Sequence, residues 1–329
     1  MGPHVQPASH LPYVGTNADA KPGRVCPVDY RYDPSELDRE PEIAADVLYV
    51  VGGLYGNAPA LDTVERLVQA ERGPVTLVFN GDFHWFDAEP AWFGEIERRV
   101  ARHMATRGNV ETEIARLDDV GAGCGCAYPE GMDDAMVTRS NEMLHQLRSA
   151  ATDGATPERL AALPMHLVAA VGGLRIGIVH GDAAALAGWR FARETLDDPA
   201  NRSWLADVRA RSRIDVFAST HTCLAALRHF DLPCGGLTVI NNGAAGMANF
   251  AGTQFGLISR IATRPSPHAP VYGAVRDGVF IDALPVAYDT AALLDRFLAR
   301  WPAGSLAHQS YFRRIVEGPD HAITAARPV

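Results

Sequence analysis

Short apolar runs alternate with amphipathic segments over the first part of the chain. The runs at 46–51 and 75–80 are typical of buried β-strands, whereas 58–71 and 91–104 repeat their apolar positions at helical spacing. Strand and helix signals in alternation indicate βαβ units and a parallel sheet. We therefore expect an α/β domain that begins near Val47.

Strand signals are denser in the second half of the chain. The two apolar runs of "HLVAAVGGLRIGIVHGD" are joined by Gly172 and Gly173, a pair that suits a two-residue hairpin turn. Asp277 and Gly278 give the same signal inside "VYGAVRDGVFIDALP". A helical segment is expected over 183–194, and "DTAALLDRFLARW" has the apolar spacing of a packing helix. Together these signals predict an α/β sandwich.

Three parts are predicted along the chain. Residues 1–45 are rich in Pro, Asp, Glu and Gly without a sustained period, which indicates an N-terminal extension that is partly irregular. Residues 46–290 form the domain, with an insertion or lid at about 112–160 that contains "VGAGCGCAYPEG" and the helical "DDAMVTRSNEMLHQLRS". Residues 291–329 are expected to form a helical segment that packs on the domain.

Composition narrows the possible partners and the compartment. The net charge is -9 and no block of Lys or Arg stands out, so nucleic acid is not expected as a main partner. Five cysteines, an odd number, and a start without a charged-then-apolar segment favour free thiols in the cytoplasm. The most apolar stretch is interrupted well short of the roughly 20 residues that a spanning helix needs, so no membrane insertion is expected. Nothing indicates the oligomeric state.

Several apolar runs end in residues that can bind a metal. The run "TLVFNGD" ends in Asp82, "ATRGN" in Asn109, "IGIVHGD" reaches His180, and "DVFASTHT" reaches His221. In a mostly parallel sheet these strand ends lie on one edge, so the four side chains can converge. One carboxylate, one amide oxygen and two imidazoles suit a divalent ion such as Mn, Fe or Zn. Each motif alone is also typical of a turn or a structural histidine, and their order and shared placement favour the metal.

The motifs, in this order, resemble those of the calcineurin-like metallophosphoesterase superfamily over about residues 47–250. The family's blocks D-x-H, G-D-x-x-D, G-N-H-D/E, a lone His after a strand and G-H-x-H stand here as "GLY", "GDFHWFD", "GNVE", "VHGD" and "THTC". The resemblance implies a metallophosphoesterase-like αββα sandwich, with two mixed sheets flanked by helices. It also implies a metal-dependent hydrolase that acts on a small-molecule phosphomonoester or phosphodiester.

The resemblance implies that one metal site is retained. The family's ligands for its second metal correspond to Asp82, Asn109, His180 and His221, so all four positions match. One divalent ion per chain is therefore expected. Asp82 and His221 are also expected to take part directly in catalysis.

The site for the first metal departs from the family's pattern. Only the shared Asp82 is present there, because the opening Asp and His are replaced by Gly53 and Tyr55, and the last His by Cys223. The acid His that follows G-N in the family is Val110. In a two-metal site, two ions hold the attacking and leaving oxygens between them. Here only one of these two ions is expected.

Nearby residues offer partial replacements. Cys223 and Tyr55 are candidates for further metal ligands, and His84, Asp87 or Glu111 for proton transfer. Each also has a structural alternative: Cys223 as small apolar filling, Tyr55 as a plug in the vacated space, and Glu111 as a cap.

Three functions remain open from the sequence. The first is a metal-dependent phosphoesterase, which the complete four-residue set favours. The second is a protein on the same fold that lacks turnover and binds a metal, a nucleotide or a protein partner, which the lost positions favour. A third is an iron or redox site formed by cysteines. Cys124 and Cys126 are too close for a typical structural zinc site, so they are expected to be buried thiols or to line a loop near the site.

Overall fold

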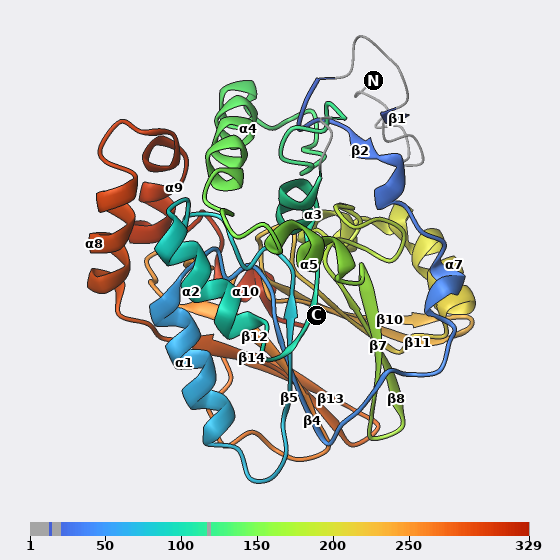
Figure 1. Ribbon diagram of the computed structural model, residues 1–329. Coiled ribbons are helices and arrows are strands. Elements are labelled where there is room, and N and C mark those ends of the chain that lie inside the picture. The colour runs from blue at the N-terminus through green and yellow to red at the C-terminus, as the bar shows by residue number, and fades with distance from the viewer. Residues whose placement is uncertain (1–12, 15–20, 117–119, 329) are drawn as a thin grey trace.

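The computed structural model of the chain describes residues 13–14, 21–116 and 120–328, and two six-stranded mixed sheets form its centre (Figure 1). The first contains β3 (Ile43–Ala44), β7 (His166–Val171), β8 (Leu174–Val179), β9 (Val216–Ser219), β10 (Ala226–Leu232) and β11 (Gly235–Asn241), in the order β10-β11-β9-β8-β7-β3. The second contains β4 (Val47–Val51), β5 (Thr76–Asn80), β6 (Met104–Thr106), β12 (Gly256–Ala262), β13 (Tyr272–Arg276) and β14 (Val279–Val286), in the order β13-β14-β12-β4-β5-β6. A separate parallel pair joins β1 (Tyr13–Val14) to β2 (Cys26–Pro27).

Helices cover the outer faces of the sheets and one end of the molecule (Figure 1). The α-helices are α1 (Ala58–Gln69), α2 (Pro90–Val100), α3 (Asn109–Ala115), α4 (Asp134–Arg148), α5 (Thr156–Ala162), α6 (Arg193–Asp197), α7 (Arg202–Ser212), α8 (Thr290–Arg300), α9 (Leu306–Glu317) and α10 (Ile323–Ala326). Short 3-10 helices lie at Val28–Tyr30, Pro34–Leu37 and Pro199–Asn201. Among the described residues, no helix is both long and apolar enough to cross a membrane.

Strand β4 shows why its sequence is apolar on both faces. Leu48 and Val50 belong to the core between the two sheets, while Tyr49 and Val51 pack on the opposite side with residues of α1 and α8. All four side chains are buried. In a strand that is buried on both faces, apolar and polar residues do not alternate. The predicted sandwich of two mixed sheets flanked by helices is confirmed.

The carboxyl ends of the parallel strands from both sheets meet at one edge. Strands β4, β5 and β6 run parallel in one sheet, and β8, β9 and β11 run parallel in the other. Asn80, the last residue of β5, bridges the sheets, because its Nδ2 donates to the carbonyls of Val179 (2.8 Å) and Ala218 (3.3 Å). The residues that follow β5, β8 and β9 are thereby held close together.

Both predicted hairpins are confirmed. Gly172 and Gly173 have φ of +55° and +87° between β7 and β8, and Asp277 and Gly278 have φ of +49° and +79° between β13 and β14. Positive φ at both central residues is the conformation of the tight hairpin turn that matches strand twist. The helix expected in "DDAMVTRSNEMLHQLRS" is also present, as α4.

Two predicted helices are wrong in whole or in part. Residues 183–192 form turns instead of a helix, and helix α6 begins only at Arg193, because the Asp182 carboxylate accepts hydrogen bonds from the backbone N–H groups of Ala184, Ala185 and Arg190. Such side-chain bonds compete with the helical ladder. The helix predicted over 91–104 ends at Val100, and Met104 begins the short strand β6, whose three residues are too few to show alternation.

Residues 21–45 pack on the domain that follows them. Strand β3 pairs with β7, Leu37 is buried against the outer face of the first sheet, and the Tyr30 hydroxyl donates to Glu113 Oε1 at 2.6 Å. Residues that precede Val47 therefore contribute contacts to the domain. The remainder of the predicted extension, apart from 13–14, lies outside the described residues.

Candidate metal centre and its pocket

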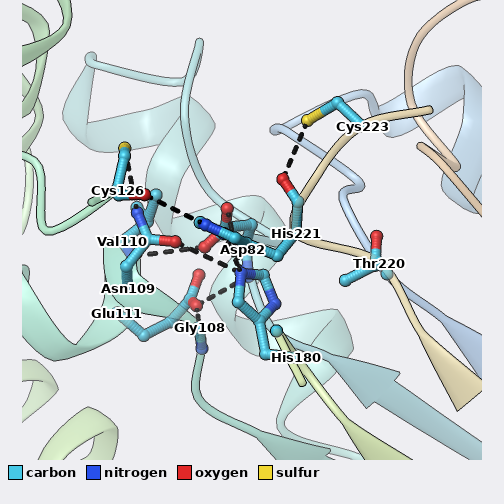
Figure 2. A network of polar contacts seen from close by, with 12 residues as sticks. Asp82, Gly108, Asn109, Val110, Glu111, Cys126, His180, Thr220, His221 and Cys223 are labelled. Atoms are coloured by element: carbon cyan, nitrogen blue, oxygen red, sulfur yellow. Dashed lines mark hydrogen bonds and ion pairs between the residues drawn. The ribbon is translucent and has the colours of Figure 1, made fainter. Parts of the chain in front are cut away.

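Four buried side chains from different strand ends converge on one point (Figure 2). His180 Nε2 lies 3.2 Å from Asn109 Oδ1, 3.2 Å from His221 Nδ1 and 3.4 Å from Asp82 Oδ2. The candidate ligand atoms of Asp82, His180 and His221 all lie within 4.8 Å of one another. The structure thus brings together the four residues that the sequence singled out as metal ligands.

Backbone carbonyls orient these side chains by hydrogen bonds on the side that faces away from the point of convergence. His180 Nδ1 lies 2.9 Å from the Asn80 carbonyl and His221 Nε2 lies 3.1 Å from the Cys126 carbonyl. A carbonyl only accepts, so each of these nitrogens carries the proton and the other ring nitrogen faces the centre with its lone pair. Asn109 Nδ2 donates to the Cys124 carbonyl at 2.9 Å, which turns its Oδ1 inward.

The donor set fits a divalent cation. In this tautomeric arrangement the inward-facing atoms are all acceptors, and a cation is the partner that satisfies them together. Nitrogen and oxygen ligands at about 2.0–2.1 Å from a tetrahedral ion are about 3.3–3.4 Å apart, close to the separations measured from His180 Nε2. Asp82, Asn109, His180 and His221 are therefore the residues that would hold the metal that this fold implies.

The electrostatics of the cluster agree with a site for positive charge. Burial opposes the charged form of His180, but the facing Asp82 carboxylate raises the pKa of this imidazole. Burial and the nearby His180 lower the pKa of His221 to about 3, which keeps that ring neutral. Burial opposes ionisation of Asp82, and His180 lowers its pKa. The Asp82 carboxylate therefore stays ionised, and its buried negative charge favours the binding of a cation.

Glu111 holds the loop that presents Asp82. Its carboxylate accepts hydrogen bonds from the backbone N–H groups of Asp82 (2.7 Å), Phe83 (3.0 Å) and Gly108 (2.9 Å). Asp82 has φ of +51°, an uncommon conformation that these bonds stabilise. Burial and the charge of Asp82 raise the pKa of Glu111 to about 7. Because both carboxylate oxygens are occupied by backbone and do not line the cavity, this geometry argues against the predicted proton transfer by Glu111.

His84 is also placed away from the site. Its two ring nitrogens lie 2.6 Å from Asp87 Oδ2 and 3.1 Å from Glu97 Oε2, and its ring stacks on Phe93. All these side chains are buried, and His84 and Asp87 lie outside the residues that line the cavity. This geometry argues against the predicted proton-transfer role of His84 or Asp87, because the two form a buried ion pair in the loop after Asp82.

Tyr55 and Cys223, which the resemblance places where the family has ligands of its first metal, contact each other. The Tyr55 hydroxyl lies 2.9 Å from Cys223 Sγ, and the Tyr55 ring comes within 3.0 Å of where a side chain on Gly53 would begin. Burial raises the pKa of both groups, so both stay protonated. A protonated phenol and thiol bonded to each other are poor metal ligands. The geometry supports the interpretation of Tyr55 as a plug and argues against both residues as ligands.

Removing this pair should leave metal binding intact. We expect Cys223→Ala and Tyr55→Phe each to retain the same number of ions per chain as the unmodified protein. Within the described part of the chain, Cys223 Sγ contacts only the backbone carbonyl of His221 (3.3 Å) in the cluster, and neither side chain is hydrogen-bonded to a candidate ligand atom. Metal content measured by mass spectrometry after reloading with manganese, iron or zinc checks this. A loss of one ion in either variant would show that the pair is a ligand after all.

A mostly apolar cavity of about 250 Å³ opens beside the cluster. Asp82, Asn109 and His221 form its polar base, and Val110 and Cys126 lie beside them. The walls come from distant parts of the chain and include Trp85, Met132, Met136, Trp189, Tyr311 and Arg314. Cys124 is buried behind the site, as expected for thiols in a loop near it.

Two mixed sheets that carry a buried carboxylate, amide and imidazole cluster at their common edge define a metallophosphoesterase type of α/β protein. The sequence profile of the calcineurin-like phosphoesterase family matches residues 45–239, more than half of the chain. The chain belongs to this family. No curated protein matches it significantly.

Solved structures show the same fold at low sequence identity. A hypothetical protein from Pyrococcus horikoshii OT3 superposes with a TM-score of 0.57 at 17% identity, over 84% of this chain and 100% of that one. A metallophosphoesterase from Sphaerobacter thermophilus does so with a TM-score of 0.50 at 17% identity, over 83% of this chain and 100% of that one. Identity at this level shows the fold alone.

Several residues of the site could not be singled out from the sequence. Asn80 precedes the "GD" motif and orients His180 through its carbonyl, but an asparagine at a strand end carries no specific signal. Arg314 and Tyr311 lie on α9, which is an ordinary amphipathic helix by pattern. Only the packing of α9 on the domain brings these two side chains to the cavity.

Proposed function

We propose that the protein is a metal-dependent phosphoesterase that uses one divalent ion, held by Asp82, Asn109, His180 and His221. The observation that carries the proposal is the convergence of four acceptor atoms, together with the hydrogen bonds to backbone carbonyls that orient Asn109, His180 and His221. A complete set of ligands whose side chains are oriented by further hydrogen bonds is typical of a functional metal site. The ion would polarise a phosphoryl oxygen and lower the pKa of a water molecule.

The residues around the cluster suit the binding of a phosphate group. Arg314 lies on the cavity wall with Nη2 donating to the Cys223 carbonyl, while its Nε has no hydrogen-bond partner within the described structure. No ion pair with an acidic side chain is found for Arg314 among the described residues. An unpaired guanidinium beside a cation site can bind the remaining oxygens of a phosphate. Glu111 keeps Asp82 in place while the substrate binds.

A second candidate is a protein that binds a metal or a phosphorylated ligand without turnover. The Tyr55–Cys223 contact favours it, because that contact fills the place of a second ion and removes half of the two-metal clamp. The cavity also presents Val110 where the family has its acid histidine. The two candidates share metal binding and differ only in hydrolysis.

Metal content and hydrolysis together test the proposal. Protein stripped by a chelator and reloaded with manganese, iron or zinc should retain about one ion per chain, as expected for a single four-ligand set. It should then hydrolyse a phosphomonoester, a phosphodiester or a dinucleoside polyphosphate, and the chelator should abolish this turnover. One ion without turnover on all three classes would favour the binding protein. No retained ion would contradict both candidates.

A further inference from the structure

The cavity beside the cluster has an unusual lining for a site that handles phosphates. Three methionines line it, Met132, Met136 and Met247, together with the indoles of Trp85 and Trp189. Apart from the cluster residues, Arg314 is the only charged side chain among the described residues of the lining. Methionine is flexible and makes favourable contacts with aromatic rings. A group that enters this cavity therefore meets apolar and aromatic surface on most sides.

Three polar groups of the walls are already engaged with the protein. Trp189 Nε1 donates to the Cys126 carbonyl at 3.0 Å, the Tyr128 hydroxyl lies 3.3 Å from Ser140 Oγ, and Thr222 Oγ1 accepts from Asn241 Nδ2 at 2.9 Å. A sugar or a nucleobase would bring several hydroxyl and amide groups into this space. Polar groups that lose water without finding partners weaken binding. The walls thus disfavour nucleotide and sugar phosphates.

The size of the cavity limits the ligand further. An apolar cavity of about 150 Å³ binds benzene, whereas pockets for drug-sized ligands start at about 300 Å³. The cavity here measures about 250 Å³. This space accommodates one phosphate group with a single ring or a compact branched chain.

The lining also restricts the leaving group. Among the described residues that line the cavity, the only carboxyl and imidazole groups are those of Asp82 and His221, which belong to the cluster. A leaving oxygen in this cavity therefore has no further carboxyl or imidazole group to protonate it. A phenolate needs no such help, because the ring stabilises its negative charge.

From these observations we infer that the substrate is a small aryl phosphoester, with its phosphate between the metal site and Arg314 and its ring against the methionines and tryptophans. The inference rests on the proposed phosphoesterase function. In the reaction, the oxygen of water forms a new bond to phosphorus and the bond from phosphorus to the aryl oxygen breaks. The phenolate leaves with the bonding electron pair, and the proton lost by the water passes to solvent.

The binding of two phosphonates that cannot be hydrolysed tests the inference separately from turnover. Calorimetry on the manganese-loaded protein should show phenylphosphonate binding at least about tenfold more tightly than methylphosphonate, because the ring buries apolar surface. Ribose 5-phosphate should bind no more tightly than methylphosphonate. Arg314→Gln should weaken both phosphonates by a similar factor, since the guanidinium contacts the group they share.

Matched substitutions locate the preference in the cavity. Met132→Gln and Met136→Gln, at half-buried positions of its wall, should reduce the ratio of the two affinities severalfold, while Met104→Gln on the exposed face of β6 should leave it unchanged. Equal affinity of the two phosphonates, or tighter binding of ribose 5-phosphate, would overturn the inference and leave the proposed function standing. Failure of the protein to retain any of manganese, iron and zinc would instead overturn the proposed function, and the inference with it.

Discussion

The His180→Ala variant should lose its metal and all metal-dependent turnover. His180 Nε2 lies within 3.4 Å of acceptor atoms on each of the other three ligand residues, so its removal takes away the atom at the centre of the set. Loss of one of four ligands leaves a site that cannot close around the ion. We expect the metal content to fall from about one ion per chain to near zero, and turnover to fall to background.

The matched control for this variant is His145→Ala. His145 is an exposed histidine on α4 that does not line the cavity, so its removal should change neither metal content nor turnover. Circular dichroism on both variants separates loss of the site from loss of the fold. Metal-dependent turnover that persists in a folded His180→Ala variant would contradict the assignment of the site.

The His84→Ala variant should be strongly destabilised without loss of a catalytic group. The substitution leaves the buried Asp87 and Glu97 without the cation between them and removes the ring that stacks on Phe93. Removing one partner of a buried ion pair costs about 3–5 kcal/mol. The free energy of unfolding, measured with urea, should fall by an amount in this range. Asp62→Ala, which breaks an exposed ion pair to Arg99, should cost less than about 1 kcal/mol.

The pH dependence of stability gives an independent readout of His84. Burial opposes its charged form, but Asp87 and Glu97 raise its pKa from 6.5 to about 10. A pKa that is higher in the folded chain contributes stability that is fully present below pH 6.5 and declines as the pH rises through about 10. The difference in stability between the unmodified protein and His84→Gln should therefore shrink across this range. A constant difference would show that His84 is neutral in the folded protein.

The sequence carried enough information for the sandwich and for the convergence of the four ligand residues. Apolar runs without a polar face, such as the one at β4, imply strands that are buried on both sides. Asp82, Asn109, His180 and His221 each follow such a run, and parallel topology brings the ends of those runs to one edge. Their use as metal ligands stays a prediction, whereas their spatial arrangement is a property of the structure.

The roles of neighbouring polar residues could not be predicted in the same way. His84 and Glu111 lie two residues after Asp82 and Asn109, where the sequence alone makes them candidates for proton transfer. The positive φ of Asp82 and the start of α3 at Asn109 turn these side chains away from the cavity and into the loop. A change in backbone direction at one residue decides where the next side chains point, and such a turn leaves no periodic pattern.

What the sequence determined by itself was the class of fold and the four residues that meet at its edge, because both follow from local periodicity and from the order of strands. The tertiary structure decided the surroundings of those residues. Met132, Arg314 and Trp189 reach the same cavity from segments far apart in the chain, and Tyr55 and Cys223 contact each other although 168 residues separate them. Such contacts depend on how whole elements pack against each other, and packing follows from shape and volume that no short stretch of sequence encodes.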